Sequence, residues 1–561
     1  MYKRQRYNLR RNRKQGWKDG DWRTSKREYG YHIAVKKALK KIGRPALMAI
    51  VSEIHQIVGK RVFHPVNMRQ LTNKQLRSII RSSIFLKEKY LPNGNFDKLK
   101  ARLVAGGHMQ DRSLYDDVSS PTVSTTEAFI VASIAASEGR AVATLDIDGA
   151  YLNADITEQE VLMKLDPIVA AILVKLRPDY ESFMQPDGTI VVKLDKALYG
   201  CVESAKLWYQ HLSGTLISMG FERNPLDICV FNRTDESGKQ CTIVVHVDDL
   251  MITCKNEATI DKVIADLTER YKDVTVKRGS VHSYVGITFD FTAKGRVKLT
   301  MDGYVRDTLR LYEVQGKAAT PAGENLYKID TNSLTLDADR VTEFHSRVAK
   351  ILYLAKRVRP DLLTATIFLA TRVQSPTEDD WSKLNRLLKY LNATPGLGLV
   401  IEPDTVLNVS AYVDVAYGVH ADGKSHTGSI ITLGKGAVYV KSSKQKLVSK
   451  SSTEAELIAL SDSSSQVIWT KNFIAAQGHS ERPATVYQDN MSTIAMADKG
   501  RSTSERTKHI HVRYFFIKDA VERGEIKIVY KPTGEMVADL LTKPLQGEQF
   551  RRLRALLLNW H

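Results

Sequence analysis

The fold is decided by residues 241–254, whose sequence is Cys-Thr-Ile-Val-Val-His-Val-Asp-Asp-Leu-Met-Ile-Thr-Cys. Two apolar runs, each typical of a β-strand, flank a short polar segment, and this pattern predicts a hairpin with Asp248 and Asp249 at its turn. Two carboxylates repel each other at such close range, and the repulsion is relieved when both bind a divalent cation such as Mg2+. For an isolated pair, a solvated Asp-Asp turn is an equally good interpretation.

A second acidic motif favours the metal interpretation. In residues 143–153, Ala-Thr-Leu-Asp-Ile-Asp-Gly-Ala-Tyr-Leu-Asn, another apolar strand ends in an acid, Asp146, and an aromatic residue follows it. Asp146, Asp248 and Asp249 together form a candidate carboxylate triad for two metal ions. Two more segments belong to the same set: residues 100–107, Lys-Ala-Arg-Leu-Val-Ala-Gly-Gly, and residues 198–209, Leu-Tyr-Gly-Cys-Val-Glu-Ser-Ala-Lys-Leu-Trp-Tyr.

The order and wording of these motifs resemble the reverse transcriptase of copia-type long-terminal-repeat retrotransposons. Five further segments resemble that family's RNase H domain and follow its order, and nine collinear motifs in one chain argue against coincidence. The five segments are residues 412–418, 451–460, 486–490, 506–510 and 538–545. The resemblance covers about residues 60–550.

The resemblance implies that Asp146, Asp248 and Asp249 are the catalytic metal ligands of the polymerase, with Asp146 and Asp248 the strongest. The implied cofactor is Mg2+, with Mn2+ as a possible substitute, and it promotes attack of a primer 3′-hydroxyl on an incoming deoxynucleoside triphosphate. No metal ligand of this set is missing from the sequence.

Three residues are expected to contact the substrate. Tyr151 occupies the family's aromatic position, where a flat ring excludes a ribose 2′-hydroxyl by steric clash; the alternative is a core aromatic residue at a strand end. Lys100 and Arg102 resemble residues of the fingers that bind the triphosphate, although a solvated basic strand explains an isolated Lys-x-Arg equally well.

The polymerase motifs also depart from the family pattern. His246 stands where the family usually has Tyr. The central motif, usually close to Leu-Tyr-Gly-Leu-Lys-Gln-Ser-Pro-Arg, differs at Cys201, Val202, Glu203, Ala205 and Lys206. Because Val202 and Glu203 replace a cation and an amide near the template-nucleotide pocket, we expect lower efficiency.

The RNase H motifs supply four more candidate catalytic and metal-binding carboxylates. Asp414, Glu456, Asp489 and Asp539 stand in the family's Asp-Glu-Asp-Asp order, as needed for two metal ions. Glu454 competes with Glu456, but positions two apart on a helix point about 200° apart, so only one faces the site. Glu456 is the interpretation we choose, because the family's catalytic acid stands in the sequence Glu-Leu-x-Ala-Leu.

The RNase H motifs also contain basic residues. Arg506 and Lys508 are expected to bind phosphate oxygens. The role of His509 is left open between a phosphate contact and product release.

The chain of 561 residues is too long for one hydrophobic core. We expect a multidomain α+β and α/β fold: a right-hand polymerase with fingers, palm and thumb, followed by an RNase H-like α/β domain. The predicted parts are a basic disordered tail (1–45), reverse transcriptase fingers and palm (46–330), a helical thumb or connection (331–404), an RNase H-like domain (405–548) and a C-terminal tail (549–561).

Periodicity predicts the main elements within these parts. Helices are expected over residues 31–59, 127–137, 256–271 and 452–477, and a helical region over 341–392 that is broken at Pro360 and Pro376. Strands of the last domain are expected over residues 406–412, 428–433, 437–440 and 485–488.

The charge is unevenly distributed along the chain. The net charge is +19 and the pI is about 9.5, and residues 1–45 alone contain 16 Lys or Arg against three acids. Such a segment is typical of a polyanion-binding tail, and a remnant without a role is an equally good interpretation. The four cysteines form no Cys-x-x-Cys pair, which argues against structural zinc and favours a reducing compartment.

The leading functional hypothesis is an RNA-directed DNA polymerase with RNase H, which copies retrotransposon RNA into DNA. The expected partners are the RNA template, DNA primer and product, RNA–DNA hybrid, deoxynucleoside triphosphates, and the element's integrase and capsid protein. No membrane partner is expected, and the expected location is a cytoplasmic virus-like particle, with the nucleus as the alternative.

A catalytically weak or co-opted remnant that binds nucleic acid is the second hypothesis. The presence of all seven carboxylates favours the enzyme. An integrase is disfavoured because no His-x-x-x-His with Cys-x-x-Cys module is present, and there is no Asp-Thr-Gly or Asp-Ser-Gly protease motif. We therefore expect a fragment of a polyprotein.

Overall fold

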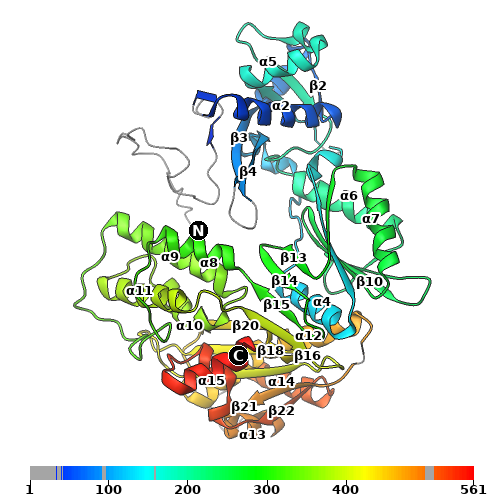
Figure 1. Cartoon of the computed structure of the whole chain (residues 1–561). Coiled ribbons are helices and arrows are strands. Elements are labelled where there is room, and N and C mark those ends of the chain that lie inside the picture. The colour runs from blue at the N-terminus through cyan, green and yellow to red at the C-terminus, as the bar shows by residue number, and fades with distance from the viewer. Residues whose placement is uncertain are drawn as a thin grey trace.

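The structure is a computed structural model that describes residues 33–34, 39–40, 42–90, 96–156, 159–479, 481–499 and 511–560. Four β-sheets with their helices organise these residues. In Figure 1, the sheet near the N-terminus forms the top of the molecule, and the elements of the C-terminal half form its base. The basic segment 1–32 lies outside the described residues.

The first sheet has the order β1-β3-β6-β7-β2, with β4 paired to β3. Its elements are β1 (Ile33–Ala34), β2 (Phe63–Pro65), β3 (Ile80–Tyr90), β4 (Phe96–Ala105), β6 (Leu162–Leu165) and β7 (Ile190–Leu194), with α2 (Arg44–Gly59), α3 (Asn73–Ser78) and α5 (Pro167–Leu176). The prediction of one helix over 31–59 is wrong at its start. Residues 33–34 pair with β3 instead, and α2 begins after Gly43 with a proline in its first turn, where the missing N–H costs no hydrogen bond.

The second sheet has the order β12-β5-β11-β10-β9-β8 and carries the hairpin predicted from residues 241–254. Its strands are β5 (Ala141–Ile147), β8 (Glu222–Arg223), β9 (Val230–Thr234), β10 (Gln240–His246), β11 (Asp249–Cys254) and β12 (Val274–Arg278). Three helices accompany it: α4 (Thr125–Glu138), α6 (Ser204–Ser218) and α7 (Glu257–Tyr271). The hairpin and the helices predicted over 127–137 and 256–271 are confirmed.

The two faces of this sheet have different surroundings. Leu145 and Ile147 of β5 pack in one core with residues of α6 and α7. Val142 packs in a different core, together with residues of α4. Because successive side chains of a strand alternate between faces, Asp146 shares the face of Val142, away from α6 and α7.

The third sheet, β13-β14-β15-β16-β19, joins segments that are distant in sequence. Its strands are β13 (Val281–Tyr284), β14 (Ile287–Asp290), β15 (Val297–Thr300), β16 (Leu399–Pro403) and β19 (Gly434–Lys435), and the nearby helices are α8 (Asp302–Leu311), α9 (Ala338–Ala355), α10 (Leu363–Ala370) and α11 (Glu378–Ala393). The helical region expected over 341–392 is confirmed, with breaks before Pro360 and Pro376. The wholly helical interpretation of 331–404 is wrong at its end, because the apolar residues of β16 pair with β15.

The fourth sheet is mixed, with the order β20-β18-β17-β21-β22 and parallel pairing between β17, β21 and β22. Its elements are β17 (Ser410–Ala416), β18 (His426–Thr432), β20 (Ala437–Lys444), β21 (Ala484–Gln488) and β22 (Ile526–Tyr530), with α12 (Ser452–Ala476), α13 (Met491–Lys499) and α14 (His511–Glu522). The predicted helix 452–477 is confirmed.

The first strand of this sheet begins four residues later than predicted. The side chain of Asp404 accepts hydrogen bonds from the backbone N–H groups of Val406 and Asn408, at 3.1 and 3.0 Å, and Leu407 takes a positive φ of 55°. These bonds hold residues 404–408 in a turn, because an Asp side chain competes with the strand for backbone donors.

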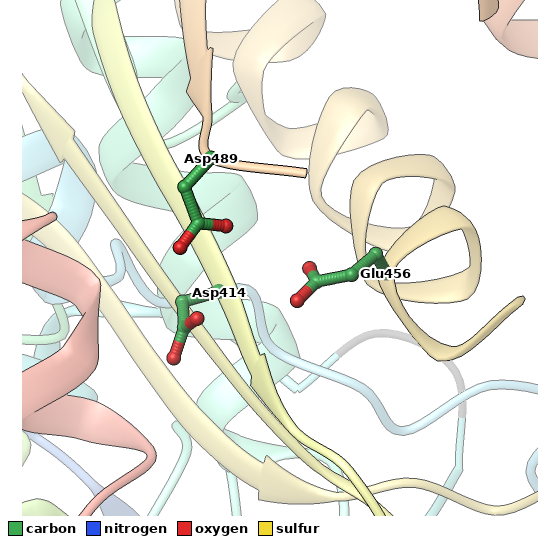
Figure 2. Close-up of side chains that lie close together, drawn as sticks. All are labelled: Asp414, Glu456 and Asp489. Atoms are coloured by element: carbon green, nitrogen blue, oxygen red, sulfur yellow. The ribbon is translucent and has the colours of Figure 1, made fainter. Parts of the chain in front are cut away.

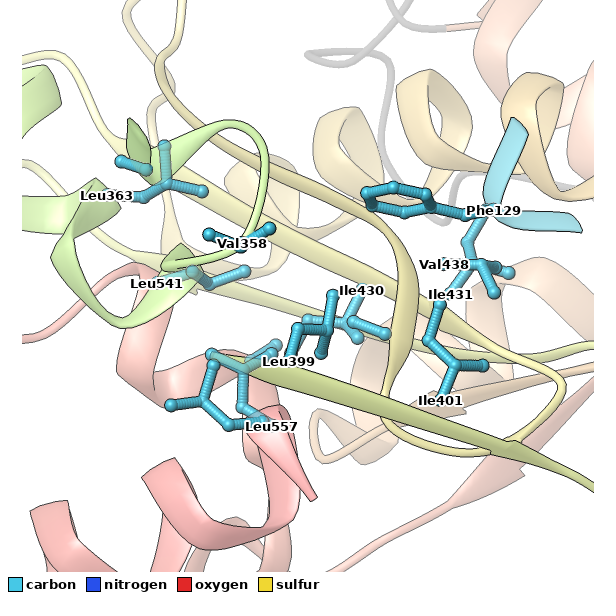
Figure 3. Close-up of a cluster of buried hydrophobic side chains, with 14 of the residues drawn as sticks. Phe129, Val358, Leu363, Leu399, Ile401, Ile430, Ile431, Val438, Leu541 and Leu557 are labelled. Carbon is cyan, nitrogen blue, oxygen red and sulfur yellow. The ribbon is translucent and has the colours of Figure 1, made fainter. Parts of the chain in front are cut away.

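The predicted C-terminal tail over 549–561 is wrong for most of its length. Residues 547–558 form α15 (Gly547–Leu558), which buries Phe550, Leu553 and Leu557 on one face at helical spacing. Figure 3 shows Leu557 close to Leu399 of β16, in the core that the third and fourth sheets share. Among the described helices, none is both long and apolar enough to cross a membrane.

Candidate active sites

The hairpin between β10 and β11 turns over two residues, because His246 pairs with Asp249 and leaves only Val247 and Asp248 between them. Val247 has a φ of 60°, which is unfavourable for a β-branched residue and usual for Gly in such turns. The indole Nε1 of Trp208 on α6 donates a hydrogen bond of 2.7 Å to the Val247 carbonyl. The helix thus holds a strained turn at the acidic pair.

Backbone pairing brings the three acids of the second sheet to one end of it. Asp249 lies directly opposite Asp146 on β5, and the N–H of Ile147 donates to the carbonyl of Asp248 at 3.1 Å. All three acids are half-buried. Their carboxylate oxygens do not gather within the 4.8 Å that defines a metal-type cluster among the described residues.

The three predicted substrate residues also lie at this end of the sheet. The rings of Tyr151 and Tyr199 are 4.8 Å apart, and the guanidinium of Arg102 lies 4.2 Å above the Tyr199 ring. Burial, followed by the charge of Asp248, raises the pKa of Tyr151. Arg102, Tyr199 and Tyr151 therefore form a row of contacting side chains that leads toward the acidic turn.

Lys100 is bound to an acid next to the triad. Its Nζ lies 2.6 Å from Asp148 Oδ1, so β4 is tied to the loop that follows β5. This ion pair is partly exposed and is open to exchange with a charged ligand.

Two glycines explain why the motifs around residues 107 and 200 contact each other. A Cβ atom at Gly107 would lie 1.9 Å from the Gly200 carbonyl oxygen, and one at Gly200 would lie 2.2 Å from the Ala105 oxygen. The N–H of Ala105 donates to the Tyr199 carbonyl at 2.7 Å across the same contact. Only glycine permits this approach of the two segments.

The departures from the family pattern have structural consequences. Glu203 is buried, and Gln110 donates to its Oε2 at 3.3 Å, while Oε1 has no partner among the described residues. Burial lowers the pKa of His246, whose Nδ1 also finds no described partner. Both departures thus leave unsatisfied polar atoms, that of His246 beside the acidic turn and that of Glu203 at the start of α6, and such atoms are costly.

The structure brings three of the RNase H candidates together. Asp414 lies on β17, Glu456 on α12 and Asp489 directly after β21, and one carboxylate oxygen from each lies within 4.8 Å of the others. Figure 2 shows the three side chains converging. Burial, and then the charges of Asp414 and Asp489, raise the pKa of Glu456 to about 9. A set of hard oxygen donors that repel one another fits Mg2+.

The fourth candidate, Asp539, lies beside this cluster but outside it. Lys543 Nζ lies 2.7 Å from Asp539 Oδ1 and 3.5 Å from Asp414 Oδ1, so its ammonium group bridges the two acids. The hydroxyl of Thr542 also donates to Asp414. Burial, and then Asp414, raise the pKa of Asp539.

Glu454 and Glu456 occupy different environments on α12. Glu454 Oε2 accepts a hydrogen bond of 2.9 Å from the Lys450 N–H, and its own N–H donates to the Ser451 hydroxyl at 3.2 Å, so it completes the start of the helix. Glu456 points into the cluster, where Gln488 Nε2 donates to it at 3.3 Å.

The sequence-based prediction did not include several residues whose hydrogen bonds hold this site. Thr533 donates to Asp489 at 2.8 Å, and Tyr327 donates to the Thr542 carbonyl at 2.8 Å from a distant part of the chain. Lys543 had a signal, because it follows Asp539 by four residues within one motif, whereas the other contacts had none. Arg506, Lys508 and His509 lie outside the described residues.

The sequence was compared with protein families and with known proteins. Residues 72–322 match the family described as reverse transcriptase (RNA-dependent DNA polymerase). The chain is 32% identical over 538 residues to the Retrovirus-related Pol polyprotein from transposon RE1 of Arabidopsis thaliana, covering 93% of this chain and 35% of that protein. It is 27% identical over 480 residues to the Retrovirus-related Pol polyprotein from transposon TNT 1-94 of Nicotiana tabacum, covering 82% and 34%.

Among solved structures, the Prototype Foamy Virus protease-reverse transcriptase matches with 13% identity and a TM-score of 0.27, covering 90% of this chain and 55% of that one. This likeness is too loose to define the fold. The sequence relatives extend over most of the chain, which itself spans about a third of their length. The chain belongs to the Pol proteins of copia-type retrotransposons.

Proposed function

We propose that this chain is an RNA-directed DNA polymerase with RNase H activity, which copies retrotransposon RNA into DNA and degrades the RNA of the hybrid. The observation that supports it most is the convergence of Asp414, Glu456 and Asp489 in the same chain as the reverse transcriptase match. The mixed sheet that carries these acids is typical of an RNase H-like fold. The proposed parts are fingers and palm (46–330), thumb (331–404) and RNase H (405–548).

In the proposed polymerase site, Asp146, Asp248 and Asp249 bind Mg2+, or Mn2+ in its place. The metal pair supplies charge neutralisation at the attacking and leaving oxygens. Their backbone positions at one sheet end support this role.

Tyr151, Lys100 and Arg102 bind the incoming nucleotide in this proposal. Tyr151 presents its ring where a 2′-hydroxyl would clash, and its contact with the Tyr199 ring supports this role because it holds the Tyr151 ring in place. Lys100 exchanges Asp148 for a phosphate oxygen, and Arg102 provides a second cation on the same strand. The partners are template RNA, primer DNA and deoxynucleoside triphosphates.

In the proposed RNase H site, Asp414, Glu456, Asp489 and Asp539 bind the two metal ions that activate water and stabilise the leaving oxygen. Family membership also suggests two protein partners, the element's integrase and its capsid protein. The proposed location is a cytoplasmic virus-like particle, with the nucleus as the alternative. The competing proposal is a remnant that binds nucleic acid without efficient catalysis, and it is favoured by the unsatisfied buried oxygen of Glu203.

Primer extension on a poly(rA) template, with and without Mg2+, tests the proposal, together with cleavage of an RNA–DNA hybrid. Asp248→Asn should abolish synthesis and leave cleavage largely intact, whereas Asp489→Asn should do the reverse, because the two sites bind separate metal pairs. Asp261→Asn, on the exposed side of α7, is the matched control. Comparable loss of both activities in one folded variant would contradict two independent sites, and inactivity of the wild type would favour the remnant.

A further inference from the structure

A buried chain of hydrogen bonds runs beside the RNase H acids, and the proposed reaction does not use its members. His420 follows β17, His426 is the first residue of β18, and Ser442 lies on β20. All three are buried. His420 Nε2 lies 3.0 Å from His426 Nδ1, and His426 Nε2 lies 2.8 Å from the Ser442 hydroxyl oxygen. That hydroxyl oxygen lies 2.8 Å from the carbonyl oxygen of Leu541, where the chain of bonds ends.

The direction of each hydrogen bond in this chain follows from its last acceptor. A carbonyl oxygen only accepts, so the single hydrogen of the Ser442 hydroxyl points to Leu541. His426 Nε2 then donates to the Ser442 oxygen, and because a neutral imidazole has one N–H, His426 Nδ1 accepts from His420 Nε2. Burial lowers the pKa of His420 to about 4 and that of His426 to about 3, so both rings are neutral at neutral pH, as this order requires. His420, His426 and Ser442 therefore form one directional set of donors, the histidine relay.

The relay ends beside an RNase H acid, on the helix that carries another. Asp414 of β17 lies directly opposite Gly428 of β18, and Gly428 lies directly opposite Ser442 of β20. Residues that pair in this way lie on the same face of the sheet, so these three form one row across it. The short helix Val537–Leu541 packs onto this row at the glycine, where a Cβ atom would be 2.9 Å from two atoms of the helix. The helix is therefore held close to the sheet between Asp414 and Ser442.

Side chains from distant parts of the chain hold the end of this short helix. The last carbonyl groups of a helix have no partners within it. Three consecutive carbonyls accept from hydroxyl groups instead: that of Leu540 from Thr364 at 2.7 Å, that of Leu541 from Ser442 at 2.8 Å, and that of Thr542 from Tyr327 at 2.8 Å. The Tyr327 ring lies 5.1 Å from the His420 ring and 5.6 Å from the His426 ring. The two imidazoles therefore orient two of the three donors, Ser442 by a hydrogen bond and Tyr327 by ring contact.

A displaced segment 539–543 would change the RNase H site directly. It carries Asp539 and also Lys543, whose ammonium group bridges Asp539 and Asp414. The hydroxyl of its Thr542 donates to Asp414. Groups that orient metal ligands without binding the metal typically change metal affinity by about 10–100-fold when they are mutated.

We propose that the histidine relay positions the segment 539–543 for metal binding by the RNase H acids. The inference rests on the proposed function and adds His420, His426 and Ser442 to it as positioning residues. Among the described residues, none of the three forms a hydrogen bond or ion pair with an RNase H acid, so they act through the Leu541 carbonyl. Because Tyr327 packs on the relay, the RNase H site also depends on a segment that precedes its own sheet.

The test uses the full chain and four variants. Ser442→Ala removes the donor to Leu541, and His426→Leu removes the donor to Ser442. His426→Gln restores an N–H for Ser442 and a carbonyl oxygen that accepts from His420. The matched control is Ser443→Ala, whose side chain points to the opposite face of the same strand.

Three quantities are measured for each protein. They are the dependence of hybrid cleavage on Mg2+ concentration, the amide hydrogen exchange of residues 537–543 against Mg2+ concentration, and the rate of DNA synthesis. The exchange measurement reports metal binding without requiring cleavage. Thermal midpoints establish that each variant is folded.

Ser442→Ala and His426→Leu should each raise the Mg2+ concentration for half-maximal cleavage about tenfold, while the rate at saturating Mg2+ falls by less than about threefold. Residues 537–543 should exchange faster without metal, and about tenfold more Mg2+ should be needed to slow that exchange. His426→Gln should recover most of the loss. Ser443→Ala should behave as the wild type, and DNA synthesis should be unchanged in all four variants.

An unchanged Mg2+ requirement in both Ser442→Ala and His426→Leu would overturn the inference. An equal shift in Ser443→Ala would do the same, and so would a His426→Gln variant that behaves like His426→Leu, since the ring would then act by packing alone. A wild type that cleaves no hybrid would contradict the proposed function, and the dependence of amide exchange on Mg2+ would then decide the inference by itself.

Discussion

Glu456 is held among carboxylates that repel it, and this crowding links stability to metal binding. Its pKa is raised to about 9 by burial and by Asp414 and Asp489. A carboxyl with a raised pKa stabilises the folded chain fully below its unfolded value, about 4.5, and this contribution is lost as the pH rises toward 9. At neutral pH Glu456 therefore holds a proton, and a cation bound by these acids would displace it.

Glu456→Gln should abolish RNase H cleavage and, without metal, stabilise the chain by about 1 kcal/mol or more at pH 8, because the amide is neutral without the proton that Glu456 must take up on folding at that pH. The gain should shrink toward pH 5, close to the unfolded pKa of about 4.5, because the unfolded chain then also begins to hold this proton. Thermal unfolding in EDTA between pH 5 and 8, beside a hybrid cleavage assay, measures both effects.

Glu454→Gln is the matched control two residues away. It weakens the start of α12 and should cost about 1 kcal/mol at either pH, while cleavage changes only a few-fold. The opposite ranking in cleavage would show that Glu454 is the metal ligand. A pH-independent gain in the Glu456 variant would mean that the pKa of Glu456 is not raised in the folded chain.

Tyr151→Ala should admit ribonucleotides, because it removes the ring that contacts Tyr199 and faces the proposed sugar position. The ratio of rCTP to dCTP incorporation should rise by at least about tenfold, or ~1.4 kcal/mol of lost discrimination. Tyr151→Phe keeps the ring and should keep the ratio. If the ratio is the same in all three proteins, Tyr151 is a packing residue only.

At the scale of elements, the contact between Gly107 and Gly200 fixes β4 against the segment before α6. Gly107→Ala places a Cβ 1.9 Å from a carbonyl oxygen, so the backbones must separate, at a cost of about 1–3 kcal/mol. Synthesis should fall more than hybrid cleavage, because the strand carrying Lys100 and Arg102 shifts. The measurements are urea unfolding and both activities.

Gly214→Ala in α6 is the control, since a Cβ there meets nothing within 4 Å. It should stabilise the helix by about 0.5–1 kcal/mol, as alanine usually does when it replaces glycine in a helix. Equal behaviour of the two variants would show that the glycine contact has no role in holding the segments together.

Elements with strong local periodicity were predictable, and those made by distant partners were not. The hairpin 241–254 and α12 follow from their own side-chain patterns. Strand β16 was not expected, because its pairing with β15 depends on residues about a hundred positions away. Helix α15 did carry a signal in Phe550, Leu553 and Leu557, but it follows the last recognisable motif.

The same limit applies to the sites. Motifs in the sequence identified the acidic residues of both candidate sites, because a carboxylate at the end of a strand is a local pattern. The partners that hold them, such as Lys543, Thr533 and Tyr327, depend on tertiary packing. The strain at Val247 was likewise invisible, since valine predicts a strand rather than a turn with positive φ.

At the scale of the whole molecule, positive charge is concentrated at the start of the sequence. Residues 1–30 contain eleven Lys or Arg and three acids, so they carry +8 of the net +19. Residues 33–34 pair with β3, so a deletion must end before them to leave the first sheet intact. Deleting residues 1–30 therefore removes this charge and leaves the pairing of residues 33–34 with β3 in place.

Deleting residues 1–30 should weaken hybrid binding at low salt and flatten the slope of log affinity against log salt, because fewer counterions are released on binding. Both catalytic activities should persist at saturating substrate. A second variant keeps the length of the segment but replaces its Lys and Arg with Gln, and it should match the deletion if charge alone matters. A truncated chain with the full-length slope would show that the segment is passive, and that the rest of the chain makes all the phosphate contacts.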